Sequence, residues 1–286
     1  MADSVYLETT ALIDGILKGW YPELSDIIEK ANGVSTSQYS KMEIKKGFLH
    51  KWVLLYNKAV RCKSFEDISL FISNLTSSPN RYYLGACVDA VSIFEADYSK
   101  KKPSELKGQY ADINEGEIRL NAFKSNLRTQ IKLCFHKIST RVRETHNPMQ
   151  CFKDLGAPFL EKKMFINKPL KCDESRDKCN ITQYIRDNKD AFEKILKKLE
   201  TIKEKDKETT KRIRSLKEIL KLINNDRPIS NHHQNQGLCW DCTDAIHAVI
   251  PPHDSTLLTR NIRHFEPICE AIGRNFKGYS SPKIAP

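Results

Sequence analysis

The sequence predicts an α/β protein whose parallel-sheet core is formed by the two ends of the chain, with a mainly helical insert between them. Near each end, a short apolar run of the strand type is followed by a segment with helical spacing. Between the ends lie long runs rich in Lys, Glu, Leu and Ile with the helical period. We therefore expect residues 1–100 and 231–286 to form the core and residues 101–230 to form the insert.

The first expected strand is the apolar run at residues 5–7, and a helix is expected to follow it from about residue 9 to residue 17. Thr9 or Thr10 is the expected cap of this helix, because a hydroxyl at its first position satisfies an otherwise unpaired N–H group. Glu8 then stands at the carboxyl end of the strand. Open α/β folds place their chemistry at such ends, although an acid there is also commonly a surface or capping residue.

Residues 33–39 (GVSTSQY) are polar and typical of a loop, and a helix is expected from about Ser40 to Val60. Glu43 lies in the first turn of that helix, where a carboxylate complements the helix dipole. The apolar positions of the helix are Ile44, Phe48, Val53, Leu54 and Tyr56, with Trp52 partly covered. Residues 64–97 indicate one or two further helices with a break at Pro79.

A strong helical pattern covers residues 112–146 and ends at the Asn-Pro pair of residues 147–148. Its basic residues form a stripe: Lys124, Arg128 and Lys132 repeat at every fourth position, and Lys137 and Arg141 continue the row. Such a stripe can contact a phosphate backbone, and it is also typical of a solvated helix face.

Residues 189–225 contain neither Gly nor Pro, and they predict a long helix or a helical hairpin. Two apolar stripes in this segment are separated by the polar run KEKDKETTKR, which is typical of a hairpin tip or an exposed stretch. The preceding residues 151–180 are irregular, and the spacing of Cys172 and Cys179 is not the usual one for zinc ligands.

Residues 239–273 predict a helix, a proline-bounded loop, a buried strand at 255–259, a polar turn and a closing helix. Asp241, Asp244 and His247 share one face of the first helix, because residues three apart are neighbours on a helix surface. A carboxylate face beside the end of a strand is where open α/β folds carry out chemistry.

The composition describes an ordinary globular chain with an excess of positive charge. Lys and Arg number 47 against 36 Asp and Glu, which gives a formal charge of +11 and favours a polyanionic partner, nucleic acid above all. No apolar run approaches the roughly 18 residues that cross a membrane, and no secretory signal is evident. The 9 scattered cysteines fit free thiols in a reducing compartment, so we expect a cytoplasmic protein without a membrane partner.

Four segments resemble the PIN-domain nucleases. They are LETTALID after the first strand, KMEIKKGFL around Glu43, the helix start Asp244-Ala245-Ile246-His247-Ala248, and LLTRNIRHF at the last strand and turn. The likeness covers only about the first 60 and the last 55 residues, and the helical middle has no counterpart. It implies a PIN-like core of three layers around a parallel sheet.

The resemblance also implies a metal site of carboxylates at the ends of the strands. The acids that would bind Mg²⁺ or Mn²⁺ are Glu8, Glu43 and Asp244. Asp241 is a further candidate catalytic acid. Polar groups around them would come from Thr9, Thr259 and Asn261.

Two features depart from the family pattern. Glu8 stands where the family usually has Asp, so its carboxylate reaches one methylene further. Asn261 and His264 follow the last strand, where many members place a fourth acid. The binding of a second metal ion and the retention of catalysis are therefore open.

The resemblance implies a metal-dependent nuclease that cleaves RNA in preference to DNA, of a kind found in toxin–antitoxin and defence systems. Its expected partners are nucleic acid, an inhibitor or antitoxin protein, and a second copy of the chain. The alternative is a PIN-like module that binds nucleic acid or protein with little or no cleavage. A separate alternative is structural zinc, held by Cys239 and Cys242 together with His232 and His233.

Overall fold

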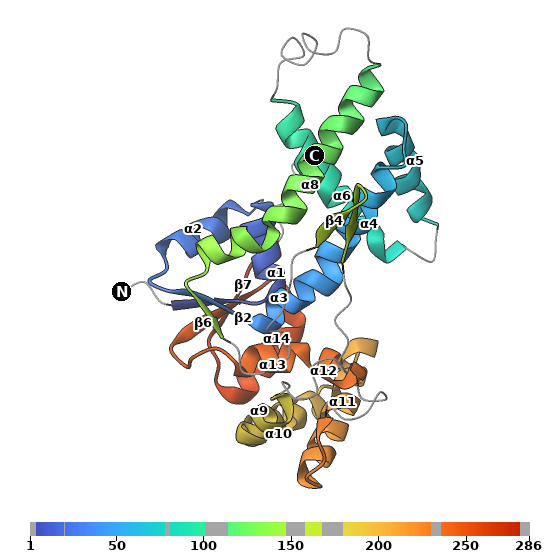
Figure 1. Ribbon diagram of the computed structural model, residues 1–286. Helices are drawn as coiled ribbons and strands as arrows, with labels where there is room; N and C mark the ends of the chain where they lie inside the picture. Colours follow the sequence, from blue (N-terminus) through green and yellow to red (C-terminus); the bar gives the residue numbers. More distant parts are fainter. Residues whose placement is uncertain are drawn as a thin grey trace. The chain divides into compact units, whose positions relative to one another are not determined.

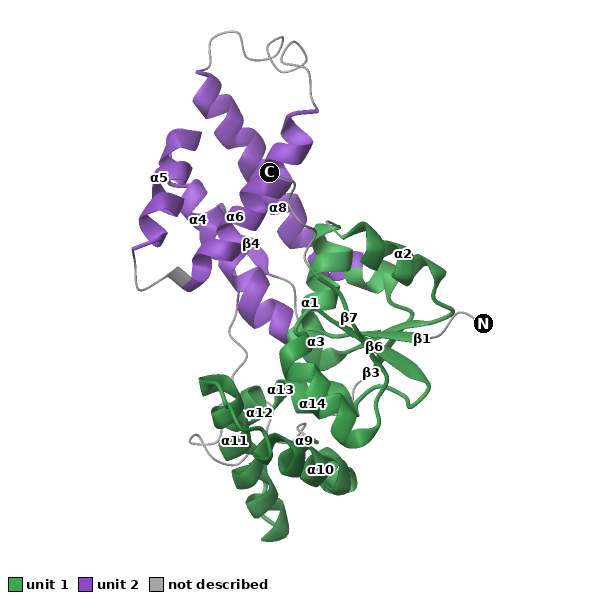
Figure 2. Ribbon diagram, turned by 180° about the vertical axis from the view of Figure 1, so that it is seen from behind, with its two compact units in different colours: residues 1–42, 138–155, 170–286 green, residues 43–137, 156–169 purple. Residues whose placement is uncertain are grey.

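The computed structural model describes residues 4–19, 21–77, 81–100, 114–146, 158–167, 180–229 and 236–280. The chain divides into two compact units (Figure 2). Unit 1 comprises residues 1–42, 138–155 and 170–286, and unit 2 comprises residues 43–137 and 156–169. These bounds differ from the expected segments 1–100, 101–230 and 231–286, because much of the first segment belongs to unit 2 and residues 189–224 belong to unit 1 with the sheet.

Unit 1 is built on a five-stranded parallel sheet in the order β3-β2-β1-β6-β7 (Figure 1). The strands are β1 (Ser4–Leu7), β2 (Val34–Ser37), β3 (Glu144–His146), β6 (Ser255–Thr259) and β7 (Phe276–Gly278). The chain leaves the central strand β1 on one side and later adds β6 on the other, so the strand order reverses between β1 and β6. In parallel sheets a crevice opens at the carboxyl ends of the strands at such a reversal. The expectation of an α/β core with a parallel sheet is confirmed.

The expected loop at residues 33–39 is wrong, because residues 34–37 form the strand β2 between β1 and β3. All four of its residues are buried, and the hydroxyl groups of Ser35, Thr36 and Ser37 all have partners. Thr36 Oγ1 donates to the carbonyl of Leu7 at 2.7 Å, and Ser35 Oγ donates to that of Val5 at 3.3 Å. Small hydroxylic residues with internal partners thus replace the apolar residues expected of a central strand.

Helices cover both faces of the sheet (Figure 1). On one face lie α1 (Thr9–Leu12), a π-helical turn (Ile13–Lys18) and α2 (Pro22–Lys30), whereas α13 (Thr243–Val249) and α14 (Ile262–Ile272) lie on the other. Successive strand residues point to opposite faces. Tyr6 and its register partner Leu257 therefore point to the same face, and both join the core beneath α13 and α14.

Glu8 itself, rather than Thr9 or Thr10, is the N-cap of α1. Its backbone is extended, with φ −73° and ψ 178°, and its side chain accepts from the backbone N–H groups of Thr10 and Ala11. A carboxylate at this position satisfies two N–H groups that have no partner inside the helix, which a single hydroxyl cannot do. The expected cap was therefore placed one residue too late.

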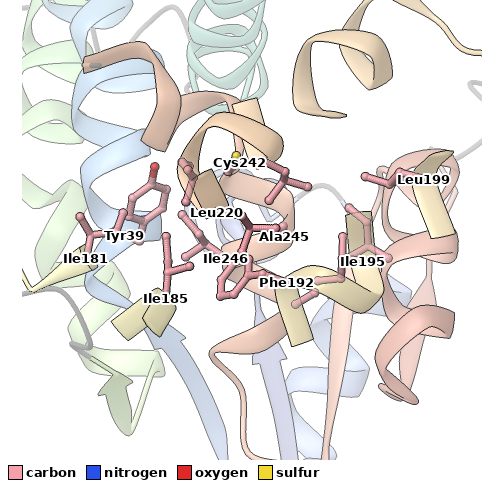
Figure 3. Close-up of a cluster of buried hydrophobic side chains, with 14 of the residues drawn as sticks. Tyr39, Ile181, Ile185, Phe192, Ile195, Leu199, Leu220, Cys242, Ala245 and Ile246 are labelled. Carbon is pink, nitrogen blue, oxygen red and sulfur yellow. The ribbon is translucent and has the colours of Figure 1, made fainter. Parts of the chain in front are cut away.

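The segment 189–225 is a hairpin of two helices, α10 (Lys189–Glu200) and α11 (Lys207–Asn224), and α9 (Ile181–Asp187) precedes it. Asp206 caps α11 by accepting from the N–H of Thr209 at 2.7 Å. Figure 3 shows the buried cluster in which apolar side chains of α9, α10, α11 and α13 meet. The hairpin alternative is confirmed, and it packs into the core of unit 1.

The helix expected to carry Asp241, Asp244 and His247 is interrupted. α12 (Gln236–Asp241) ends before Cys242, whose dihedral angles of φ −104° and ψ 12° are not helical, and α13 begins at Thr243. Asp241 and Asp244 therefore do not share the face of one continuous helix. Two further strands of the five-stranded sheet were also not expected, because β3 lies within the predicted helix 112–146 and β7 follows Gly273.

Unit 2 is mainly helical and begins within α3 (Gln38–Ile44), which continues as a π-helical turn (Lys45–Leu49) into α4 (His50–Ala59). The remaining elements are α5 (Phe65–Leu75), a 3-10 turn (Arg81–Tyr83), α6 (Leu84–Tyr98), α8 (Glu115–Arg141) and the antiparallel pair β4 (Phe159–Glu161) and β5 (Met164–Ile166). Its core contains Trp52, Phe65, Phe94 and Phe123, whereas Leu54, expected on the apolar face of α4, is 39% exposed. None of the helices in the described ranges is long and apolar enough to cross a membrane.

Candidate functional site

The candidate site lies in unit 1 at the carboxyl ends of β1 and β6, where the strand order reverses. Glu8, the first residue after β1, is 3% exposed. Its Oε2 accepts from the N–H of Thr10 at 2.8 Å, and its Oε1 accepts from the N–H of Ala11 at 3.2 Å and from the Thr10 hydroxyl. The start of α1 thus holds the Glu8 carboxyl in place.

The pKa of Glu8 is raised from 4.5 to about 7. Burial is the largest cause, because it disfavours the charged form, while the hydrogen bonds from Thr10 and the charge of His247 oppose it. The negative charge of Asp244 raises the pKa further. Glu8 and Asp244 therefore repel one another across the same edge of the sheet, although 236 positions separate them in the sequence.

Asp244 lies in the first turn of α13 and forms an ion pair with Arg212 of α11. Nδ1 of His264 lies 3.6 Å from Oδ2 of Asp244. Burial favours the neutral acid, but the contact with His264 and the charge of Arg212 outweigh it, so the pKa of Asp244 is lowered. At neutral pH Asp244 is ionised.

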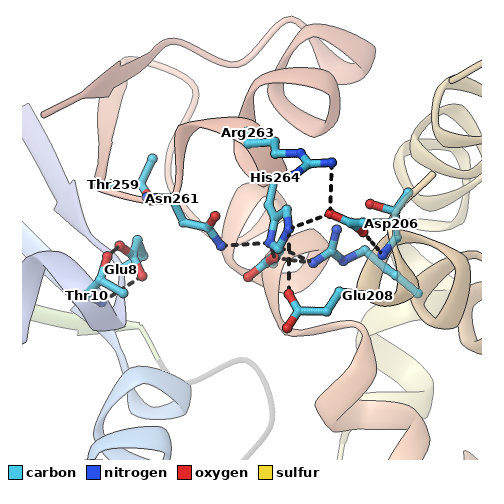
Figure 4. Close-up of polar contacts among 11 residues, drawn as sticks. Glu8, Thr10, Asp206, Glu208, Thr259, Asn261, Arg263 and His264 are labelled. Atoms are coloured by element: carbon cyan, nitrogen blue, oxygen red, sulfur yellow. Dashed lines mark hydrogen bonds and ion pairs between the residues drawn. The ribbon is translucent and has the colours of Figure 1, made fainter. Parts of the chain in front are cut away.

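His264, in the first turn of α14, lies among three carboxylates (Figure 4). Its Nε2 is 3.5 Å from Asp206 and 3.6 Å from Glu208, and Asn261 Nδ2 is 2.8 Å from its Nδ1. The contact with Asp244 is the main reason that the pKa of His264 is raised above 6.5. His264 thus favours its protonated form more than a free imidazole does, at a position where the resemblance implies a fourth acid.

His247 of α13 contacts both β1 and the start of α1. It is 1% exposed, its Nδ1 lies 2.9 Å from the Tyr6 hydroxyl, and its Nε2 lies 3.4 Å from Oγ1 of Thr9. Thr259, at the end of β6, is fully buried, and its Oγ1 accepts from the N–H of Asn261 at 3.0 Å. The three expected polar residues Thr9, Thr259 and Asn261 therefore all lie at this edge.

Asp241 and Asp244 both contact α11, but they contact different residues of it. Lys211 Nζ lies 2.6 Å from its Oδ1, and the Ser215 hydroxyl donates to its Oδ2 at 3.0 Å. A pocket of about 280 Å³ nevertheless has both acids in its wall. The residues that line it are Glu208, Lys211, Arg212, Trp240, Asp241, Thr243, Asp244, Asn261 and His264.

The remaining expected residues belong mostly to unit 2. Glu43 is half-buried near the end of α3 and is assigned to unit 2, whereas Glu8, Asp241 and Asp244 belong to unit 1. In the basic stripe on α8, Arg128, Lys132 and Arg141 are exposed, whereas Lys124 and Lys137 are half-buried. Arg141 falls in unit 1 and lies 3.6 Å from Glu29.

Two of the expected metal-binding acids have the chemistry that Mg²⁺ and Mn²⁺ require. Among the described residues, no group of three or more His, Cys, Asp or Glu side chains is arranged to hold a metal ion. The carboxylates of Glu8 and Asp244 are hard oxygen donors, and their mutual repulsion is what a bound cation would relieve. Arg212 supplies the competing positive charge at Asp244.

The zinc alternative depends in part on His232 and His233, which lie outside the described ranges. Cys172 and Cys179, whose spacing is not that of zinc ligands, also lie outside them. Cys239 is half-buried at the site, and Cys242 is buried with a thiol pKa raised well above 9, chiefly by burial. Burial therefore keeps the Cys242 thiol protonated, whereas zinc binds the thiolate.

Arg212 and its neighbours on α11 were not expected at the site. The available signal was a break in the apolar stripe, because Arg212 and Ser215 fall on the helix face that also carries Leu216 and Ile219. A charged residue on a buried face needs a partner of opposite charge. Nothing in the pattern identifies that partner as Asp244, 32 residues away.

Comparisons of the chain with protein-family models, curated proteins and solved structures found no match.

Proposed function

We propose that the chain is a PIN-like, metal-dependent nuclease that hydrolyses phosphodiester bonds, with RNA as its preferred substrate. The observation that carries the proposal is that Glu8 and Asp244 both lie in unit 1 at the carboxyl edge of the parallel sheet, where the charge of Asp244 adds to the causes that raise the pKa of Glu8. The order of the five strands and the helices on both faces are compatible with the PIN-like fold.

Glu8 and Asp244 are the residues that would hold Mg²⁺ or Mn²⁺ in unit 1. The ion would supply an activated water and neutralise the charge of the phosphate. Because its pKa is about 7, Glu8 exchanges its proton near neutral pH, and it must lose that proton before it can act as a ligand. Thr9, Thr259 and Asn261 supply polar groups around the two acids.

The distribution of charge supports nucleic acid as the partner. Unit 2 contains 19 Lys and Arg against 11 Asp and Glu, so it carries +8 of the formal +11. The proposed active site is in unit 1, whose own net charge is only +3. We assign the binding of the phosphate backbone to unit 2, including the exposed Arg128 and Lys132 of α8.

A second candidate is a PIN-like module that binds nucleic acid or another protein, such as an inhibitor or antitoxin, without cleavage. The ion pair of Arg212 with Asp244 favours it, because an internal cation already neutralises the acid that a metal ion needs. The positions of Asn261 and His264, in place of a fourth acid, also favour it. With either candidate we also propose a role in cytoplasmic toxin or defence systems and self-association of the chain as a dimer.

Cleavage of RNA separates the two candidates. The purified chain is incubated with single-stranded RNA and with DNA of the same sequence, in Mn²⁺ and in EDTA. The nuclease proposal predicts cleavage only with Mn²⁺, and a loss of about 100-fold or more in Glu8→Gln and Asp244→Asn. Asp254→Asn is the matched control, because Asp254 is an exposed acid just before β6, at the opposite end of that strand. Binding without cleavage in any divalent cation supports the second candidate instead.

A further inference from the structure

Unit 2 holds two tyrosines side by side on its surface, in the 3-10 turn that precedes α6. Tyr82 is 60% exposed, and among the large hydrophobic residues of the described ranges only Leu70 is more exposed. The ring centroids of Tyr82 and Tyr83 are 4.0 Å apart, with an interplanar angle of 38°. The Tyr82 hydroxyl donates to that of Tyr83 at 2.7 Å.

This arrangement is unusual for adjacent residues. In a 3-10 turn, neighbouring side chains point in directions about 120° apart, so their rings normally diverge. Here the bond between the two hydroxyls joins the far ends of the rings and keeps them together. The same bond is the largest cause that raises the pKa of Tyr83 above its ordinary value of 10. The result is an aromatic surface that is held in shape before any partner arrives.

A cation lies beside this surface. Lys51 of α4 has its Nζ 6.0 Å from the centroid of the Tyr82 ring, which is within the reach of a cation–π contact. The surface belongs to the unit that carries +8 of the net charge. An exposed aromatic ring next to a cation, on a strongly basic unit, combines the two features with which proteins bind unpaired nucleic acid strands.

We propose that Tyr82, Tyr83 and Lys51 form a stacking surface for the bases of single-stranded nucleic acid. The exposed face of Tyr82 would stack on an unpaired base, and Lys51 would contact the adjoining phosphate. In a duplex the bases are stacked on one another and do not offer their faces, so the surface selects single strands. The inference rests on the proposed nuclease for its biological role, and it narrows the substrate of that nuclease to a single strand.

Binding in the absence of divalent cations tests this inference separately from cleavage. A fluorescently labelled single-stranded RNA of roughly 12 nucleotides is titrated with the full chain in EDTA, over a range of salt concentrations. We expect Tyr82→Ala to weaken binding about tenfold without changing the salt dependence, and Tyr82→Trp to retain binding. Lys51→Ala should reduce the slope of log K against log salt by about 1. Leu70→Ala, an exposed apolar residue on α5 of the same unit, should bind as the wild type does.

Several outcomes would overturn the inference. They are the absence of RNA binding by the wild type, wild-type affinity in Tyr82→Ala, and an equal loss of affinity in Tyr82→Ala and Leu70→Ala. An equal loss for single-stranded and duplex RNA would also exclude base stacking. Because Tyr82 is exposed, an unchanged thermal unfolding curve is expected for its variants and shows that the fold is kept. Tight binding that depends on Tyr82, with no cleavage, would support this inference and contradict the nuclease proposal.

Discussion

Arg212 of α11 and Asp244 of α13 form an ion pair in which the two side chains are only 7% and 15% exposed. Nη2 of Arg212 faces Asp244, whereas its Nε and Nη1 have no hydrogen-bond partner among the described residues. Burying a guanidinium with unsatisfied N–H groups costs free energy, and the negative charge of Asp244 offsets part of that cost. Arg212 is thus positioned at the acid that the proposed function assigns to a metal ion.

The first prediction concerns the stability of this pair. Asp244→Asn should lower the free energy of unfolding by about 3 kcal/mol, because it leaves Arg212 charged and buried without a counter-ion. Arg212→Gln should have a cost of similar size, and the double variant should cost much less than the sum of the two. Urea unfolding of the four proteins gives the coupling energy. Additive costs would show that the two side chains do not interact.

The second prediction is that Arg212 competes with a divalent cation for Asp244. Arg212→Gln should bind Mn²⁺ more tightly than the wild type, so Mn²⁺ should raise its thermal unfolding temperature by more. Lys211→Gln is the matched control, because Lys211 is the preceding residue on α11 but contacts Asp241 and is 65% exposed. An equal Mn²⁺ effect in the wild type and in Arg212→Gln would contradict competition.

The third prediction follows from the pKa of Glu8. Because this pKa rises from 4.5 to about 7 on folding, the stability that protonated Glu8 contributes is complete below pH 4.5. It is lost as the pH rises through 7, and the total is about 3 kcal/mol. Glu8→Gln mimics the protonated side chain. It should therefore match the wild type at low pH and exceed it in stability at pH 8, although the nuclease proposal predicts that it has lost activity.

Urea unfolding of the wild type and of Glu8→Gln at several pH values measures this difference. The sign of this difference in unfolding free energy distinguishes Glu8 from an ordinary surface acid, because substitution of a surface acid leaves the pH dependence of stability nearly unchanged. A Glu8→Gln variant that is less stable than the wild type at pH 8 would show that the charged form is the one favoured by folding. Mn²⁺ affinity should also increase as the pH rises through 7, since the metal requires the ionised carboxylate.

The fold was predictable where the strands are apolar. Residues 255–259 (STLLT) were expected as a buried strand and form β6. In contrast, β2 has the sequence VSTS, and its burial depends on hydroxyl groups that bond inside the sheet, which a hydrophobic pattern cannot reveal. The strand β3 has only three residues, ETH, and starts three positions after the 27-residue helix α8. A segment this short and polar has no strand pattern of its own, and it forms a strand because it pairs with β2.

The candidate site was predictable to a similar degree. Glu8 and the Asp244 helix start could be located because strand ends and helix starts have local signatures. The break at Cys242, which separates Asp241 from Asp244, has no Gly or Pro to mark it. Likewise, Arg212 pairs across 32 residues, and its partner is determined by the packing of α11 against α12, the helix that leads into α13. Long-range ion pairs of this kind are decided by tertiary structure and have no local pattern.

The fourth prediction concerns the exposed part of the basic stripe. Arg128→Ala and Lys132→Ala should each weaken the binding of RNA and reduce its salt dependence by about one phosphate contact. Lys30→Ala serves as the control, because Lys30 is an exposed lysine on α2 of unit 1 that is paired with Asp26. Electrophoretic or fluorescence titrations at several salt concentrations measure the slope. A slope that is unchanged in both stripe variants would remove α8 from the nucleic-acid interface.

The position of a bound Mn²⁺ ion is the most direct test of the central claim. Crystals of the chain grown with Mn²⁺ are measured at the manganese absorption edge, where the anomalous signal locates the ion. The nuclease proposal predicts a peak about 2.1 Å from carboxylate oxygens of both Glu8 and Asp244, with Arg212 moved away from Asp244. A peak among Asp206, Glu208 and His264 with the Arg212–Asp244 pair intact, or no peak at all, would contradict it.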